Sequence, residues 1–397
     1  MNIRPFAGSA AGASILALLA SGCTANTNSA PAMPAAPAPM RAANQNNQGN
    51  QGNHGQGNQG QGNQGNQGNG GGIFHQLKHQ VVIGSTIDGV YGQLNPYGLD
   101  VAKSTNGAFT KGDLAVCNFN DSSNVQGTGY TIVALHPKPG STPALVAADP
   151  TTLLGCTAVA LTSDDTIFAA AFAANDNPVF SSSGSLITKL SGSPFNSPFG
   201  ETYAQPKKGS PVIYESNAAD GTIVRISIGG SYGTEVIATG FPVNGGPPGS
   251  ILGPSGLQYD AHRDMLYVVD GQNNSVTTIS KVSSLHAGCL TVKSNGKSFG
   301  GRCGSQARIL YEGAPLNGPI SSALFFNGTI VVGNTLDPNG ENLMVEINPG
   351  GHVGEVRNVD TGAAGSLFGM VATGTNAADT KLYFNDDNDN NLQVLER

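Results

Sequence analysis

The chain has 397 residues, of which 11% are charged, and its formal net charge is −7 at pH 7. This sparse and negative charge argues against nucleic acid as a partner, because neutralising backbone phosphates takes clustered Lys and Arg. The one basic doublet, Lys207–Lys208, is expected to lie in a solvated turn.

Residues 1–22 have the features of an export signal peptide. One basic residue, Arg4, precedes an apolar run from Ala10 to Ala20 that is too short to span a membrane. The ending Leu19-Ala-Ser-Gly-Cys23 resembles the bacterial lipobox, which implies cleavage before Cys23 and attachment of fatty acyl chains such as palmitate. We therefore expect a lipoprotein that is anchored to the bacterial cell envelope, in the outer membrane if the cell is Gram-negative. The alternative is an ordinary secretory signal with an incidental Cys23.

Residues 23–72 are predicted to form a disordered tether. The segment is rich in Ala and Pro to about residue 43, and residues 44–72 are almost wholly Asn, Gln and Gly. Such a composition offers no apolar surface to offset the entropy lost on folding. Self-association through Gln and Asn is an alternative, but the Gly content favours a plain spacer.

Residues 73–397 are built from a repeated pattern of apolar strand, Asx-rich turn and alternating strand. The six copies begin at Leu114, Ile167, Val212, Leu266, Ile330 and Leu382. The starts are roughly 45 to 64 residues apart, which is close to the period of propeller blades. Small and apolar strands precede the copies, further strands follow most of them, and no helical period is present. The pattern predicts an all-β, six-bladed propeller of four-stranded antiparallel blades.

The ends of this ring are predicted to meet. The chain stops at Arg397, just after the third strand of the last copy, whereas residues 79–84 form an apolar strand that precedes the first blade. If this strand completes the last blade, the ring has no open sheet edge.

The cysteines other than Cys23 form an even set, as expected of a disulfide framework in an exported chain. Cys289 and Cys303 flank a Gly-, Ser- and Lys-rich insertion, and a disulfide there would staple a loop without a core of its own. Cys117 and Cys156 belong to neighbouring blades. We predict that both pairs form disulfides, with buried free thiols as the alternative for Cys117 and Cys156.

The turns between second and third strands are rich in oxygen ligands and should all lie on one face of the ring. The candidate residues for a metal or ligand on this face are Asn118, Asp121, Asp176, Glu215, Asp270, Asn273, Asn334, Asp386 and Asp387. A ring of such oxygens over a central channel would suit Ca²⁺. The alternative is that Asn, Asp and Gly are present because tight hairpins need residues that tolerate the left-handed region and cap turns. That alternative explains why all six copies have them.

No catalytic residue can be assigned from motifs. The histidines show no H-x-H or H-E-x-x-H spacing that would mark a zinc site. The segments Gly256–Asp260, Leu266–Asp270 and Asn273–Ile279 resemble the NHL-repeat group of six-bladed propellers. This resemblance implies a binding function, and the relatives of that group include gluconolactonase-like and streptogramin-lyase-like enzymes. The lactonases hold a divalent cation with a Glu near the first inner strand, but residues 95–99 contain no Glu.

We therefore expect a lipid-anchored, extracytoplasmic propeller with a monomeric head. Its expected role is non-catalytic binding of a protein, glycan or small ligand at the Asx-rich face. The alternative is a metal-dependent hydrolase or lyase with its site in the central channel.

Overall fold

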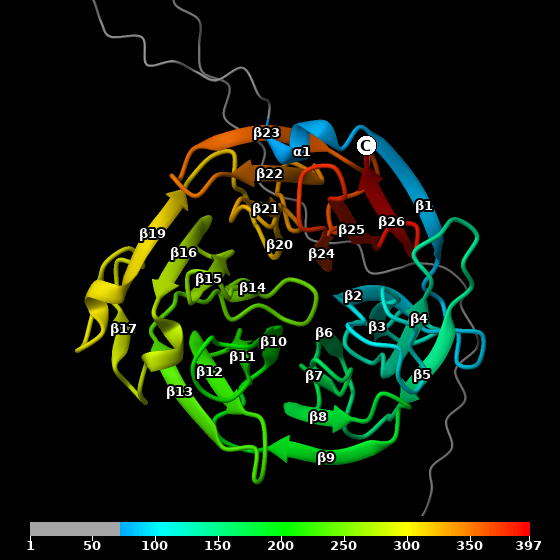
Figure 1. Cartoon of the computed structure of the whole chain (residues 1–397), viewed down its shortest axis with the longest axis horizontal. Helices are drawn as coiled ribbons and strands as arrows, with labels where there is room; N and C mark the ends of the chain where they lie inside the picture. Colours follow the sequence, from blue (N-terminus) through cyan, green and yellow to red (C-terminus); the bar gives the residue numbers. More distant parts are fainter. Residues whose placement is uncertain (1–71) are drawn as a thin grey trace, which may run out of the picture. The chain divides into compact units, whose positions relative to one another are not determined.

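The computed structural model describes residues 72–397 (Figure 1). The signal peptide at 1–22, the lipidation of Cys23 and all but the last residue of the tether at 23–72 lie outside the described residues. Within residues 72–397, no helix has the length and apolar character needed to cross a membrane.

Six β-sheets form a closed ring, as the repeat pattern predicts (Figure 1). Blades 1 to 3 contain β2 (Leu94–Val101), β3 (Leu114–Asn120), β4 (Thr131–Leu135) and β5 (Ala144–Ala148); β6 (Cys156–Leu161), β7 (Ile167–Ala171), β8 (Asp176–Phe180) and β9 (Leu186–Ser191); and β10 (Pro198–Ala204), β11 (Val212–Asn217), β12 (Thr222–Ser227) and β13 (Thr234–Thr239). Blades 4 to 6 contain β14 (Pro254–Asp260), β15 (Met265–Asp270), β16 (Ser275–Ser280) and β19 (Ala307–Glu312); β20 (Ser321–Leu324), β21 (Ile330–Gly333), β22 (Leu343–Ile347) and β23 (Val353–Asn358); and β24 (Met370–Thr373), β25 (Lys381–Asp386), β26 (Asn391–Glu396) and β1 (His79–Ser85).

Small residues let the inner strands of neighbouring blades approach closely around the axis. A Cβ atom on Gly200 of β10 would come within 2.0 Å of the Ser255 carbonyl oxygen of the next blade. A Cβ on Gly369, just before β24, would come within 2.2 Å of the Tyr97 carbonyl oxygen. Any larger side chain at these positions would push the blades apart, so the small residues of the inner strands are required by the closed ring.

The ring closes through the N-terminal strand, which confirms the prediction for residues 79–84. β1 pairs antiparallel with β26, with Val81 opposite Val394. The short helix α1 (Ile73–Gln76) precedes β1 and docks on blade 5, where the Phe74 N–H donates to Glu346 Oε1 over 3.2 Å. The Arg357 guanidinium lies 4.5 Å from the centre of the Phe74 ring. This segment therefore ties blade 5 to the blade that closes the ring.

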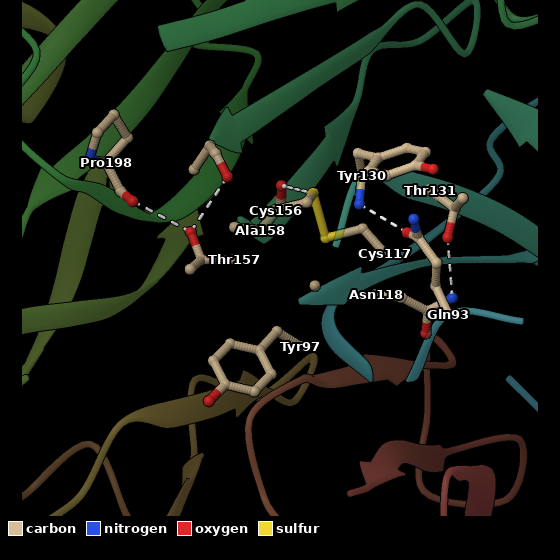
Figure 2. Close-up of a disulfide and its surroundings, with 12 residues drawn as sticks. Gln93, Tyr97, Cys117, Asn118, Tyr130, Thr131, Cys156, Thr157, Ala158 and Pro198 are labelled. Carbon is tan, nitrogen blue, oxygen red and sulfur yellow. Dashed lines mark hydrogen bonds between the residues drawn. A yellow bond between two sulfur atoms is a disulfide. The ribbon is translucent and has the colours of Figure 1, made fainter. Parts of the chain in front are cut away.

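Both predicted disulfides are present. Cys117 of β3 is bonded to Cys156 of β6, which links blades 1 and 2 beside the inner strands (Figure 2). Cys289 is bonded to Cys303 within the insertion of blade 4. Such bonds are typical of extracytoplasmic proteins.

The insertion is more ordered than the sequence pattern indicates. It contains the 3-10 turns η1 (Val282–Ser284) and η2 (Gly304–Gln306) and the short strands β17 (Leu290–Val292) and β18 (Phe299–Gly300). β17 pairs in parallel with β13, with Ala238 opposite Leu290, so the sheet of blade 3 has six strands. The disulfide therefore supports a strap between blades 3 and 4, because Leu290 and Val292 are buried in the core that these blades share.

Candidate functional site

The ring has two chemically different ends. We call turn face the end formed by the turns between second and third strands and by the connections from each outer strand to the next inner strand. The two kinds of loop bond to each other, as the 2.6 Å hydrogen bond from the Gly155 N–H to the Gly129 carbonyl shows. Likewise, Asn217 Nδ2 donates to the Pro194 carbonyl over 2.8 Å. The predicted gathering of these turns on one face is thus observed, and we call the other end the opposite mouth.

Apolar side chains fill the channel just below the turn face. Tyr97 stacks on Phe119 at 4.2 Å and on Phe368 at 3.6 Å between ring centres. Phe199 and Ile320 belong to the same buried cluster. The channel is therefore closed at this end by hydrophobic packing.

The long connection at residues 240–253 reaches across this face. Ile251 is buried in the apolar cluster and Leu252 packs against it. A Cβ on Gly249 would come within 2.6 Å of Gln126 Oε1, which belongs to the β3–β4 turn of blade 1. A loop from the junction of blades 3 and 4 thus contacts blade 1.

Two of the predicted Asp residues, Asp121 and Asp270, cap the backbone of their own turns. Asp121 Oδ1 accepts from the N–H groups of Ser123 and Val125, and Asp270 Oδ1 accepts from those of Gln272 and Asn273. These bonds are those of turn caps.

The predicted amides connect loops to one another. Asn118 Nδ2 donates to the Thr86 carbonyl over 3.1 Å, and Asn273 Nδ2 donates to the Gly296 carbonyl over 3.0 Å. Asn334 accepts from the Asn317 N–H and donates to the Pro315 carbonyl over 2.7 Å. These contacts show how the residues support the loops, while metal or ligand binding by them stays a prediction.

The acidic residues of blade 6 influence one another's ionisation. Burial and then the neighbouring Asp360 raise the pKa of Asp386 to about 6. Burial and then Asp386 raise the pKa of Asp387 well above its usual value. With its amide oriented so that its oxygen accepts from Asn120, Asn95 donates to Asp387 over 2.6 Å. Within residues 72–397, no three His, Cys, Asp or Glu side chains are grouped so that they could hold a metal ion.

Two of the predicted residues contact other side chains. Asp176 begins β8 and forms a 3.3 Å ion pair with Lys189 of β9. Glu215 lies inside β11, directly opposite Glu201 of the inner strand β10. Asn177 of β8 donates from Nδ2 to Glu215 Oε2 over 2.5 Å and to Glu201 Oε1.

Glu201 and Glu215 form a buried acid pair in blade 3. Glu215 is fully buried and Glu201 is 9% exposed. Burial raises the pKa of Glu215 to about 8. Burial and then the adjacent Glu215 carboxylate raise the pKa of Glu201 well above its usual value. The two carboxyl groups therefore hold at least one proton near neutral pH in the absence of a bound cation.

Glu201 lines two neighbouring spaces that share several wall residues. The first is a chamber of about 60 Å³ at the level of Gly98, Gly200 and Gly256, which we call the axial chamber. The second is a pocket of about 120 Å³ in the opposite mouth, lined among others by Lys103, Tyr203 and Gln258. In that pocket Lys103 Nζ forms a 3.1 Å ion pair with Asp100. Access to the pair is therefore from the opposite mouth.

The turn face also exposes large apolar side chains at the junction of blades 6 and 1. Val90 is 68% exposed, Val125 50%, Tyr91 43% and Ile87 36%. We call these four residues the apolar patch. Their two loops are in contact, because the Tyr91 and Tyr130 rings meet edge to face at 5.5 Å and the Tyr130 N–H donates to Gln93.

Comparison with known proteins identifies the fold alone. No family model matches the sequence, and no curated protein matches it. The structure is similar to that of a gluconolactonase from Xanthomonas campestris, with 12% sequence identity, a TM-score of 0.51, and coverage of 77% of this chain and 87% of that chain. It is also similar to that of a putative gluconolactonase, with 10% sequence identity, a TM-score of 0.50, and coverage of 80% of this chain and 91% of that chain. It is also similar to virginiamycin B lyase from Staphylococcus aureus (14%, 0.48, 80% and 98%). Similarity at this level of identity concerns the fold alone, and the activities named for those proteins do not transfer to this chain.

Proposed function

We propose that the protein is an exported, lipid-anchored binding module that docks on another envelope protein through its turn face. The observation that carries this proposal is the apolar patch. Contiguous exposed apolar side chains are typical of protein interaction sites, whereas scattered single ones need no explanation. Aliphatic side chains with one tyrosine suit the core of a protein interface better than they suit a hydroxyl-rich glycan.

The remainder of the turn face supports a rigid docking surface. The buried apolar cluster beneath it and the Asx caps hold the loops, so little conformational freedom is lost on binding. Cys23 would supply the anchor. The proposed partner is held in the same membrane.

Site-specific photocrosslinking in intact cells tests the docking surface. A photoreactive residue at Tyr91 should give one discrete protein adduct, which the additional substitution Val90→Asp should remove. The matched control is Phe326, which is 43% exposed in the β20–β21 turn of the opposite face and should give no such adduct. The proposal fails if Tyr91 gives no adduct or if both positions give the same one.

The anchor has its own test. Metabolic labelling with a palmitate analogue should mark the parent protein, and Cys23→Ser should remove the label while leaving an exported protein. An unlabelled parent would identify an ordinary secretory signal.

A hydrolase or lyase in the channel is the second candidate, favoured by the Glu201–Glu215 pair beside the axial chamber. Its substrate would have to enter from the opposite mouth, since the other end is packed. Turnover of a lactone that Glu201→Gln abolishes would support it, and equal activity of the two proteins would exclude Glu201 from the chemistry.

A further inference from the structure

We propose that Glu201, Glu215 and Asn177 bind a divalent cation at the edge of the axial chamber. This site differs from the Asx turns, and it does not depend on docking at the turn face. Its three residues come from β10, β11 and β8, so neighbouring strands of blades 2 and 3 build it. A site on strands is positioned more rigidly than one on loops.

The three side chains converge. Glu201 and Glu215 are opposite each other in the antiparallel register, and the Asn177 amide contacts both carboxylates. With both carboxyl groups ionised, three further oxygen atoms have no hydrogen-bond partner: Glu201 Oε2, Glu215 Oε1 and Asn177 Oδ1. A proton shared by the pair would join the two carboxyl groups but would leave the Asn177 oxygen unpaired. Asn177 and Glu215 are fully buried. Leaving such oxygens unpaired in the interior is costly unless something compensates them.

A separate observation on the chamber wall also indicates a ligand. The Ser322 side chain lines the axial chamber from blade 5, is 4% exposed, and its hydroxyl has no partner. Buried hydroxyls of this kind are ordinarily satisfied by water or an ion. A hydrated cation held by the two carboxylates would place its water molecules within the space that Ser322 and Gln258 line.

Charge and size select the class of ligand. Among the described residues, no Lys, Arg or His forms an ion pair with Glu201 or Glu215. Lys103, the cation in the adjoining pocket, is held by Asp100 and by the Leu161 carbonyl at 2.6 Å. A chamber of about 60 Å³ has room for an ion with a few water molecules. Hard divalent cations take carboxylate, amide and water oxygens.

The Asn177 amide can serve both states of the site. As oriented, its NH₂ group donates to the two carboxyl groups, which suits the pair when it holds a proton. Rotation of the amide by half a turn would place Oδ1 beside both carboxylates, and the donor set would then be three oxygens. Cation binding is thus expected to displace the shared proton.

Calorimetric titration of the full-length Cys23→Ser protein, after chelator treatment, tests the site. CaCl₂, MgCl₂ and MnCl₂ are each titrated at pH 7.5, with the melting temperature measured in parallel. At least one cation should bind at a single site and raise the melting temperature. Glu201→Gln and Glu215→Gln, which keep shape and fold, should each weaken that binding at least tenfold. The double variant Asp270→Ala, Asp386→Ala should bind as the parent does.

Three results would overturn the proposal. The first is no saturable heat with any of the cations up to about 10 mM. The second is unchanged binding in both Glu→Gln variants. The third is loss of binding in the Asp270→Ala, Asp386→Ala variant with retention in Glu215→Gln, which would place the ion at the turn face instead.

Discussion

Replacement of Glu215 by Gln should stabilise the metal-free protein at alkaline pH. In the folded protein, burial raises the pKa of this carboxyl from 4.5 to about 8. The folded state therefore keeps a proton that the unfolded state has released at neutral pH. Linkage then requires stability to fall as pH rises from about 4.5 to about 8, and the whole penalty is present above pH 8.

The size of the effect follows from the shift. Each tenfold change in proton affinity corresponds to about 1.4 kcal/mol, so a shift from 4.5 to about 8 implies a penalty of about 5 kcal/mol. Gln cannot ionise and keeps most of the shape, so Glu215→Gln removes much of this penalty. The unfolding entropy of a ring of this size is about 0.7 kcal/mol/K, which converts the penalty to roughly 7 °C.

Differential scanning calorimetry in EDTA at pH 5 and pH 8.5 measures the effect. EDTA is needed because a bound cation would replace the proton. We expect Glu215→Gln to melt several degrees above the parent at pH 8.5 and close to it at pH 5. Glu341→Gln, at an exposed position, is the matched control and should match the parent at both values. A Glu215→Gln difference that is absent at pH 8.5, or equal at the two pH values, would refute the reasoning.

The two disulfides and the docking of α1 on blade 5 should each stabilise the ring. Replacing Cys117 and Cys156 by Ser should lower the melting temperature more than replacing Cys289 and Cys303, because the bridged residues are 39 apart in the first pair and 14 in the second. The chain-entropy model gives a loss of stability of about 4 kcal/mol for the Cys117–Cys156 disulfide and about 3 kcal/mol for the Cys289–Cys303 disulfide. A larger drop in melting temperature for the second pair, measured by calorimetry without reductant, would show that strain or local packing determines the effect instead. Phe74→Ala should lower the free energy of unfolding by about 3 kcal/mol, because it removes the buried ring with which α1 docks on blade 5. Thermal melting against a substitution at an exposed residue measures this effect. An unchanged melting temperature would show that the docking of α1 does not contribute to stability.

The repeat pattern made the ring predictable because each blade repeats one local rule. An apolar second strand, a turn that tolerates the left-handed region and an alternating third strand return in every copy, so six weak signals reinforce one another. The closing strand was predictable for the same reason, since one copy lacked its outer strand. The parallel pairing of β17 with β13 was not, because it joins segments about 50 residues apart that share no pattern.

Of the Glu201–Glu215 pair, the sequence indicated only Glu215 as a candidate site residue. Glu215 was a candidate because it precedes an Asx turn, but in the structure it is a residue of β11 opposite Glu201. Glu201 is not among the candidates named from the sequence. An acidic residue in a strand otherwise built of small and apolar residues was the available signal. The pairing of Glu201 with Glu215 could not be predicted, because a register shift between Pro198 and Glu201 decides which residue of β10 faces Glu215.

The central claim is that the turn face is occupied by a protein partner in the envelope. Its most direct test is the rate of maleimide labelling of Val90→Cys in native envelopes and in the purified protein, with Phe326→Cys as the control for the opposite face. Val90→Cys should react at least fivefold more slowly in envelopes than in the purified protein, while Phe326→Cys should react at the same rate in both. Equal rates at Val90→Cys in the two preparations would contradict it.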